Sequence, residues 1–131
     1  MEYRRLGSSG LQVSALGLGT NTVGPDLDEA ATEAVIGRLL DLGANFIDTA
    51  DAYSRGVSES HIGKALNRLG RRNQAIVATK CGIPMSEAPN DGGASRQHIT
   101  DSVHNSLRRL QTDHIDLLQI HRPDPNTPIE E

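Results

Sequence analysis

Short apolar runs alternate with stretches of helical periodicity along most of the chain. The short runs are mainly aliphatic, whereas in the longer stretches the apolar residues recur every three or four positions. The first pattern is typical of buried strands and the second of amphipathic helices. Alternation of this kind favours right-handed βαβ units and a parallel sheet. We expect strands over 15–20, 45–48, 75–80 and 115–121, and helices over 28–42, 58–69 and 95–110.

Residues typical of helix ends mark the boundaries of the first two helices. Asp28 and Ser58 precede their apolar stripes, so each is predicted to be an N-cap. Gly43 and Gly70 follow the last periodic residue and are predicted to stop the same helices.

Further elements are predicted near the two ends of the sequence. Segments 3–6 and 11–14 flank the turn Gly7-Ser-Ser-Gly10, which predicts an N-terminal β-hairpin. Thr127 followed by Pro128 is typical of an N-cap and a first helical position. We therefore expect a fourth helix to begin at Thr127.

Side-chain alternation helps to choose between two folds, because a doubly wound sheet and a (β/α) barrel both fit the order of elements. Alternate residues of a strand share a face, so Asp48, Lys80 and His121 end three successive strands on one face. The intervening residues, such as Ile47 and Val77, suit packing under helices. Polar groups at the inner carboxyl ends of strands are typical of barrel enzymes. The predicted fold is therefore α/β, a partial (β/α)8 TIM barrel with roughly the first four β/α units preceded by the hairpin.

Composition argues against several classes of function. The net charge of -4, without a Lys/Arg block, argues against a nucleic acid or a membrane as partner. A single cysteine, Cys81, excludes an internal disulfide, suits a cytoplasmic location and has no neighbour that marks it as a nucleophile. His98 and His104 lie on different faces of their helix, so we expect no metal site. The glycines Gly17 and Gly19 do not continue into the Rossmann dinucleotide spacing.

Four polar residues form a candidate site. Asp48, Lys80 and His121 end predicted strands, and Tyr53 lies in the loop after the second. Because the carboxyl ends of parallel strands share one rim, we expect these four groups to lie close together. Each residue alone has a simpler explanation, as a cap, a surface tyrosine or a solvated strand end. A carboxylate, a phenol, an amine and an imidazole together point to catalysis.

The same segments resemble the aldo-keto reductase family. The resemblance includes the opening segment 3–14, the Gly17-Leu-Gly-Thr20 strand end and the Ser58-Glu59 helix start. It also includes Asp48-Thr-Ala-Asp-Ala-Tyr53 and the strand ends at Lys80 and Gln119-Ile-His121. The match covers essentially the whole chain in order and looks most like the bacterial branch related to potassium-channel β subunits.

The resemblance implies NADPH-dependent reduction of an aldehyde or ketone, or the reverse alcohol oxidation. Tyr53 would protonate the carbonyl oxygen as hydride arrives. A free phenol titrates near ~10, so Lys80 would stabilise the phenolate, and Asp48 would hold Lys80 in place. His121 would hydrogen-bond the substrate oxygen and orient it.

The cofactor implied by the resemblance is NADP(H), and the implied partner is a small-molecule carbonyl substrate. Thr20, Asn21 and Asp48 would contact the nicotinamide ribose region. Most of the family's other dinucleotide contacts lie on later strands and loops, which this sequence does not contain.

The length of the chain limits the fold that it can complete. A full (β/α)8 barrel needs roughly 250 residues, whereas this chain has 131. We therefore expect residues 1–131 to be the truncated N-terminal half of an aldo-keto reductase domain, with little activity alone. The alternative is a non-catalytic half-barrel module for interaction or nicotinamide binding. Its unpaired outer strands would assemble with another copy or with a complementary half-barrel.

Overall fold

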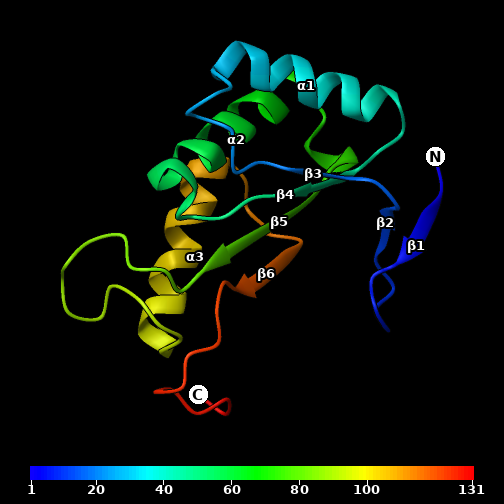
Figure 1. Cartoon of the computed structure of the whole chain (residues 1–131). Helices are drawn as coiled ribbons and strands as arrows, with labels where there is room; N and C mark the ends of the chain where they lie inside the picture. Colours follow the sequence, from blue (N-terminus) through cyan, green and yellow to red (C-terminus); the bar gives the residue numbers. More distant parts are fainter.

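Three helices lie in one layer over one face of a four-stranded parallel sheet (Figure 1). The computed structural model describes residues 1 to 131. The alternating order of strands and helices and the N-terminal hairpin are confirmed. The hairpin contains β1 (Tyr3–Arg5) and β2 (Gln12–Ser14), and the sheet contains β3 (Gly17–Gly19), β4 (Phe46–Asp48), β5 (Ile76–Cys81) and β6 (Leu117–Ile120). The helices are α1 (Glu29–Asp41), α2 (Val57–Leu69) and α3 (Arg96–Leu110), with short 3-10 helices η1 (Tyr53–Gly56) and η2 (Arg72–Gln74).

Strand order confirms the predicted barrel and excludes the doubly wound sheet. The sheet runs β3-β4-β5-β6, and each neighbouring pair is parallel. A doubly wound sheet would reverse its strand order at a switch point and carry helices on both faces. Here the spatial order follows the sequence, and the helices cover one face (Figure 1). This is the arrangement of consecutive units in a (β/α)8 barrel.

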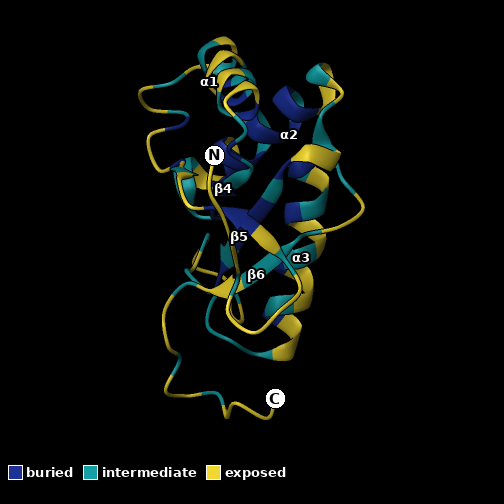
Figure 2. Ribbon diagram, turned by 90° about the vertical axis from the view of Figure 1, so that its right-hand side faces the viewer, coloured by how far each residue is buried: buried dark blue, intermediate teal, exposed yellow.

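The buried core lies between the sheet and the helices, as the buried residues of β5 and α2 show in Figure 2. Ile47 and Val77, which were predicted to face the helices, are 0% and 1% exposed. They belong to one aliphatic cluster with Ile36 of α1, Leu66 of α2 and Leu110 of α3. Burial of these side chains holds the two layers together. No helix has the length and apolar character needed to cross a membrane.

The opposite face of the sheet is only partly covered. Phe46, Ile76 and Leu117 alternate with the helix-facing residues and are half-buried. β3 and β6 each have a strand partner on one side only. The interior of the partial barrel is therefore an open face with two unpaired edges.

Most of the predicted helix boundaries are confirmed. The carboxylate of Asp28 accepts a hydrogen bond from the Ala31 N–H at 2.8 Å and caps α1. Gly43 follows that helix with φ +80°, and Gly70 ends α2 with φ +63°. Both are left-handed conformations that glycine adopts without steric cost.

The prediction that Ser58 caps the second helix is wrong. α2 begins one residue earlier, at Val57, and its N-cap is Gly56. The Ser58 hydroxyl instead contacts Thr20 and Thr49 at the ends of two strands. A serine can satisfy its hydroxyl in either way, and here the tertiary contacts replace the cap.

The prediction of a fourth helix at Thr127 is also wrong, because residues 127–131 form only a turn. The Thr127 hydroxyl donates to Asp124 Oδ2 at 2.8 Å and so does not cap a helix. The Glu131 N–H bonds to the Pro128 carbonyl at 3.1 Å and closes a single turn. One turn alone is unfavourable, because the cost of nucleation is recovered only as a helix extends.

Asn45 fixes the hairpin to the amino-terminal end of the sheet. The Ser14 N–H donates to Asn45 Oδ1 at 2.7 Å, and the Asn45 N–H donates to Ser14 Oγ at 3.0 Å. Because Asn45 immediately precedes β4, the hairpin lies away from the polar strand ends (Figure 1).

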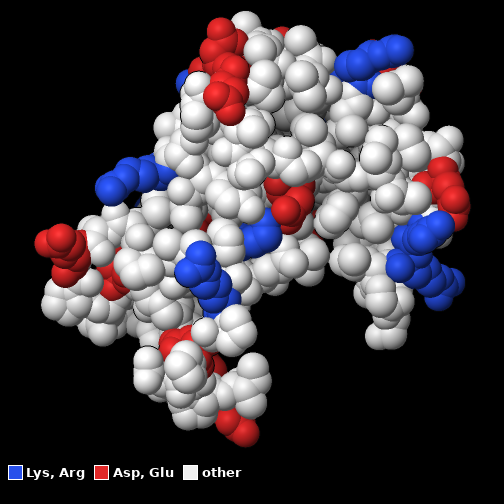
Figure 3. All heavy atoms as spheres, in the orientation of Figure 1, with Lys and Arg blue, Asp and Glu red and all other residues white.

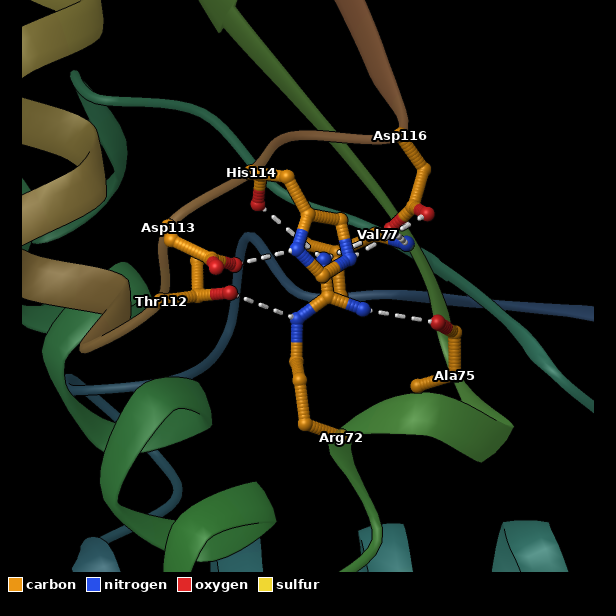
Figure 4. A network of polar contacts seen from close by, with 7 residues as sticks. All are labelled: Arg72, Ala75, Val77, Thr112, Asp113, His114 and Asp116. Carbon is orange, nitrogen blue, oxygen red and sulfur yellow. Dashed lines mark hydrogen bonds and ion pairs between the residues drawn. The ribbon is translucent and has the colours of Figure 1, made fainter.

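A polar network at the same end joins η2, β5 and the loop before β6 (Figure 4). The Arg72 guanidinium donates to Asp116 Oδ2 at 2.7 Å and to the Ala75 carbonyl at 2.9 Å. The same Asp116 oxygen accepts from the Val77 N–H at 2.9 Å. The network therefore fixes β5 relative to β6 at the end opposite the candidate site.

The loop between β5 and α3 is long and is exposed over 86–90. Gly92 and Gly93 in this loop have positive φ angles of 153° and 77°. The Ala94 N–H donates to Asp124 Oδ2 at 2.8 Å. The end of the loop is thus tied to the segment after β6.

Gly63→Ala is expected to destabilise the folded chain by about 1–3 kcal/mol through overpacking. A Cβ at Gly63 of α2 would lie 2.5 Å from the backbone of Leu110 in α3. Gly37→Ala is the matched control, since Gly37 is also inside a helix but its Cβ would lie 3.8 Å from Leu69. That control should stabilise the chain by about 0.5–1 kcal/mol. Urea denaturation followed by circular dichroism measures both, and equal effects would contradict the close approach of α2 to α3.

Candidate active site

Asp48, Tyr53 and Lys80 meet at the carboxyl ends of β4 and β5. Lys80 Nζ donates to Asp48 Oδ2 at 2.8 Å and to the Thr49 carbonyl at 2.9 Å. The Tyr53 hydroxyl lies 3.4 Å from the same nitrogen. The structure therefore brings three of the four predicted residues together around one ammonium group.

Parallel pairing explains this convergence. Asp48 lies opposite Ala78 in the register of β4 and β5. Lys80 is two residues further along β5, so its side chain leaves from the same face. β5 continues to Cys81, one residue beyond the expected strand end. The lysine therefore reaches back over the end of the neighbouring strand.

The Lys80 ammonium is held where little water reaches it, since the side chain is 14% exposed. Burying an ammonium is costly unless its charge and its N–H groups find partners. The Asp48 carboxylate supplies the opposite charge, and the Thr49 carbonyl supplies a second acceptor. The Tyr53 hydroxyl is the third neighbour of the ammonium, so the phenol oxygen lies in the electrostatic field of this cation.

His121 directly follows β6 and lies edge-on to the ring of Tyr53, with ring centroids 5.7 Å apart and planes at 83°. Burial, together with the cations Lys80 and Arg122, lowers the pKa of the His121 imidazole below its ordinary value, and Asp48 opposes the shift. Its Nδ1 is buried without a hydrogen-bond partner. At neutral pH the imidazole is therefore uncharged, and it can form a hydrogen bond with a bound molecule.

Figure 3 shows a hollow in the molecular surface in which acidic and basic side chains lie side by side, whereas other charged groups project from the outer surface. A groove beside it is lined by Gly17, Gly19, Phe46 and Asp48. The site is therefore open to small molecules from the interior side of the partial barrel.

A strained turn presents Tyr53. Ser54 and Arg55 have φ of 50° and 52°, and Gly56 follows with φ +87°. Left-handed conformations of non-glycine residues cost about 1–3 kcal/mol each and cluster at functional sites. The Ser54 hydroxyl donates to the Val23 carbonyl at 3.0 Å and helps to hold the turn.

The residues predicted to contact a cofactor lie in different surroundings at the end of β3. Thr20 is 1% exposed, and its hydroxyl donates to the Asp48 carbonyl at 2.9 Å. Asn21 is exposed, and the Asp48 side chain is 35% exposed. Of the three, Asn21 and Asp48 have side chains that a ligand can reach.

The sequence pattern does not single out Asp51, which lies in the same loop. Asp51 is 2% exposed, its Oδ1 has no partner, and its N–H donates to the Lys80 carbonyl at 3.0 Å. Burial, and then the nearby Glu59 carboxylate, raises the pKa of Asp51 to about 6. Its position between Asp48 and Tyr53 was the available signal, but the local sequence does not distinguish a buried acid from a solvated one.

Cys81 is chemically protected by its surroundings. The residue is 1% exposed, and burial, with Asp51 and Glu59 adding to the effect, raises the pKa of its thiol to about 11. The reactive thiolate is therefore scarce at neutral pH. This agrees with the interpretation of Cys81 as an inert thiol.

The family of the chain follows from comparison with known proteins. A family model described as "Aldo/keto reductase family" matches residues 15–131. The chain belongs to the aldo-keto reductase family. The resemblance found in the sequence is confirmed.

Two curated relatives cover the whole of this aldo-keto reductase chain. It is 44% identical to aldo-keto reductase YhdN of Bacillus subtilis, over 100% of this chain and 41% of the relative. It is 42% identical to a probable voltage-gated potassium channel subunit beta of Oryza sativa, over 100% of this chain and 40% of the relative. The chain therefore spans about two fifths of the length of these relatives.

A solved structure supports the fold. The aldo-keto reductase AKR11C1 from Bacillus halodurans, in its holo form, superposes with a TM-score of 0.88 and 42% identity. The match covers 100% of this chain and 43% of that one. The prediction of a partial aldo-keto reductase barrel is confirmed.

Asp51→Asn is expected to stabilise the folded chain above pH 6, by on the order of 1–3 kcal/mol, because the variant carries no buried charge. Folding raises the pKa of this carboxyl from 3.8 to about 6, so the folded state binds more protons between these values. The free energy of unfolding of the wild type therefore falls as pH rises through that window.

Urea denaturation at about pH 7.5 and about pH 3.5 measures this gain, which should be full at the higher pH and absent at the lower. Asp101→Asn is the matched control, because Asp101 is exposed on α3. An equal effect of Asp51→Asn at both pH values would contradict a buried, unpaired carboxylate.

Proposed function

We propose that this chain forms the N-terminal half of an NADPH-dependent aldo-keto reductase domain that reduces a small aldehyde or ketone, or oxidises the corresponding alcohol. One observation carries the proposal, namely that the Lys80 ammonium contacts Asp48 at 2.8 Å and Tyr53 at 3.4 Å. A phenol beside a cation can release its proton and leave a stabilised phenolate. Family membership supports redox chemistry at this site.

In the proposed reaction the substrate carbonyl lies beside Tyr53 in the hollow. NADPH, held beside Asn21 and Asp48, would supply hydride to the carbonyl carbon when it is bound. The Tyr53 phenol gives its proton to the carbonyl oxygen, and solvent later returns a proton to the phenolate. Lys80 stabilises that phenolate, and Asp48 holds Lys80. The neutral His121 ring donates a hydrogen bond to the carbonyl oxygen and fixes its direction.

The surroundings of Asp48 suit the nicotinamide ribose of such a cofactor. A Cβ at Gly19 would meet nothing within 4 Å, so space remains at the end of β3. Only Oδ2 of Asp48 bonds to Lys80, which leaves the other carboxylate oxygen as an acceptor. We assign direct ribose contacts to Asn21 and Asp48. Thr20 would act indirectly, by holding the Asp48 carbonyl.

Residues 1–131 are proposed to act as one part of a longer domain whose further strands close the barrel. The chain spans about two fifths of its curated relatives, and the holo structure from Bacillus halodurans is more than twice as long. The later strands would cover the open face and supply the remaining cofactor contacts. The 131-residue polypeptide alone is therefore expected to show little reductase activity.

Tyr53→Phe is expected to lower kcat by about 10²–10⁴-fold, because the variant removes the proposed proton donor. The measurement is NADPH oxidation with 4-nitrobenzaldehyde by residues 1–131 joined to the C-terminal part of the Bacillus subtilis relative. Tyr3→Phe is the matched control, since Tyr3 is the only other tyrosine and lies in the hairpin. A Tyr53→Phe variant with full activity would refute the assignment. Strong Tyr53-dependent activity of residues 1–131 alone would refute the need for further strands.

A second candidate function is assembly without turnover. It is favoured by the unpaired edges of β3 and β6 and by the half-buried inner residues Phe46, Ile76 and Leu117. Exposed strand edges are templates for pairing with another chain. A relative from Oryza sativa is named as a probable channel subunit, which supports an assembling role. The partner would be another copy or a complementary half-barrel, with or without bound nicotinamide.

Sedimentation velocity of the 131-residue polypeptide tests this second candidate. We expect a dimer or a larger species, because burying the open face removes apolar surface from water. Charged substitutions on that face, Ile76→Lys and Leu117→Lys, should shift the distribution toward the monomer. A wild-type monomer with one cooperative melting transition would contradict the assembly.

A further inference from the structure

Two adjacent residues at the start of α2 are fully buried although both are polar. Ser58 and Glu59 are each 0% exposed. Neither caps the helix, whose N-cap is Gly56. Buried polar groups are normally hydrogen-bonded. The partners of Ser58 and Glu59 therefore show which parts of the chain the two residues join.

Ser58 joins the carboxyl ends of β3 and β4. Its Oγ lies 3.0 Å from Thr20 Oγ1, 3.1 Å from the Thr20 carbonyl and 2.9 Å from Thr49 Oγ1. Thr20 in turn donates twice to the Asp48 carbonyl, from its hydroxyl and its N–H. The Thr49 carbonyl accepts from Lys80 Nζ. One hydroxyl thus fixes the backbone that carries Asp48 and the carbonyl that binds the lysine.

Glu59 joins β5 to α3. Its Oε1 accepts from the Thr79 hydroxyl at 2.5 Å, and its Oε2 accepts from Arg109 Nε at 2.6 Å. The Arg109 side chain passes close over Gly56, where an added Cβ would lie 2.6 Å from the arginine Cδ. The Glu59–Arg109 ion pair therefore lies against the left-handed turn that follows Tyr53.

We propose that Ser58 and Glu59 are positioning residues for the group formed by Asp48, Tyr53 and Lys80. Ser58 fixes the position of the end of β3 relative to the end of β4. Glu59 fixes the position of the end of β5. Through Arg109, it also holds the turn that orients the phenol of Tyr53. The chemical meaning of this inference rests on the proposed function, but the geometry that it concerns does not.

Packing alone does not supply such control. The apolar face of α2, with Ile62 and Leu66 in the core, is held by a non-directional effect. Hydrogen bonds fix both distance and angle. Proton transfer needs that control, because a misplacement of about 1 Å can cost ~10²-fold in rate. The buried pair therefore supplies accuracy at the strand ends, in addition to any contribution to stability.

The test compares Ser58→Ala and Glu59→Gln with the wild-type chain by NMR, using labelled tyrosine and histidine. A nuclear Overhauser effect between the rings of Tyr53 and His121 reports their edge contact, and Tyr3 is an internal reference. Ser102→Ala is the matched control, because Ser102 is a serine of α3 that is 6% exposed and contacts His98. Thermal melting confirms that each variant is folded at the temperature of measurement.

We expect both variants to lose the Tyr53–His121 effect and to shift the Tyr53 ring signals, while Tyr3 and the Ser102→Ala control stay unchanged. Unchanged Tyr53 signals in folded Ser58→Ala and Glu59→Gln chains would overturn the inference, even if their melting temperatures fell. Such a result would leave the pair a purely structural role.

Kinetics of the joined enzyme separate this inference from the proposed function. Ser58→Ala should lower kcat by about 10²-fold with little change in KM, because positioning affects the transition state more than binding. An inactive joined wild type would refute the proposed function and leave the NMR comparison to decide the inference. An active joined enzyme whose kcat is unaffected by both variants would refute the inference alone.

Discussion

The ion pair between Lys80 and Asp48 is the interaction on which the polar end of the sheet depends. The two charges come from neighbouring strands and meet because parallel register and side-chain alternation place them on one face. A lysine that is largely removed from water needs such a partner. The phenol of Tyr53 lies beside the lysine ammonium, and the ring of His121 packs edge-on against that phenol. The pair thus connects the hydrogen-bonding pattern of the sheet to the chemistry proposed at its rim.

Much of this arrangement could be predicted from the sequence, because its determinants are local. The two-residue period placed Ile47 and Val77 under the helices and Asp48 and Lys80 on the opposite face, as the structure has them. Strand–helix alternation was enough to predict a parallel sheet. Side-chain alternation then favoured the barrel over the doubly wound fold, and the observed strand order confirms it. The family resemblance depended on the same short segments.

The incorrect predictions share one physical cause, which is that a polar side chain has several possible hydrogen-bond partners. Ser58 and Thr127 both look like helix caps, but the Ser58 hydroxyl contacts the distant Thr20 and the Thr127 hydroxyl donates to Asp124, three residues earlier. The Glu59–Arg109 contact joins residues 50 positions apart, and no local pattern indicates it. The environment of Asp51 is likewise set by elements that only the fold brings together. Polar residues that can be satisfied in several ways are therefore the least predictable part of this sequence.

The segment between Tyr53 and α2 differs in kind from the loop between β5 and α3. The first segment is a run of residues in left-handed backbone conformations, held by neighbouring parts of the chain. The second is exposed over 86–90. An inserted or deleted residue in the first segment would rotate the phenol away from the ammonium, because this tight turn cannot accommodate a change in length. The second could lengthen at small entropic cost. Length variation among descendants of this sequence should therefore collect in the loop after β5, where new segments could reshape access to the hollow without disturbing the proton donor.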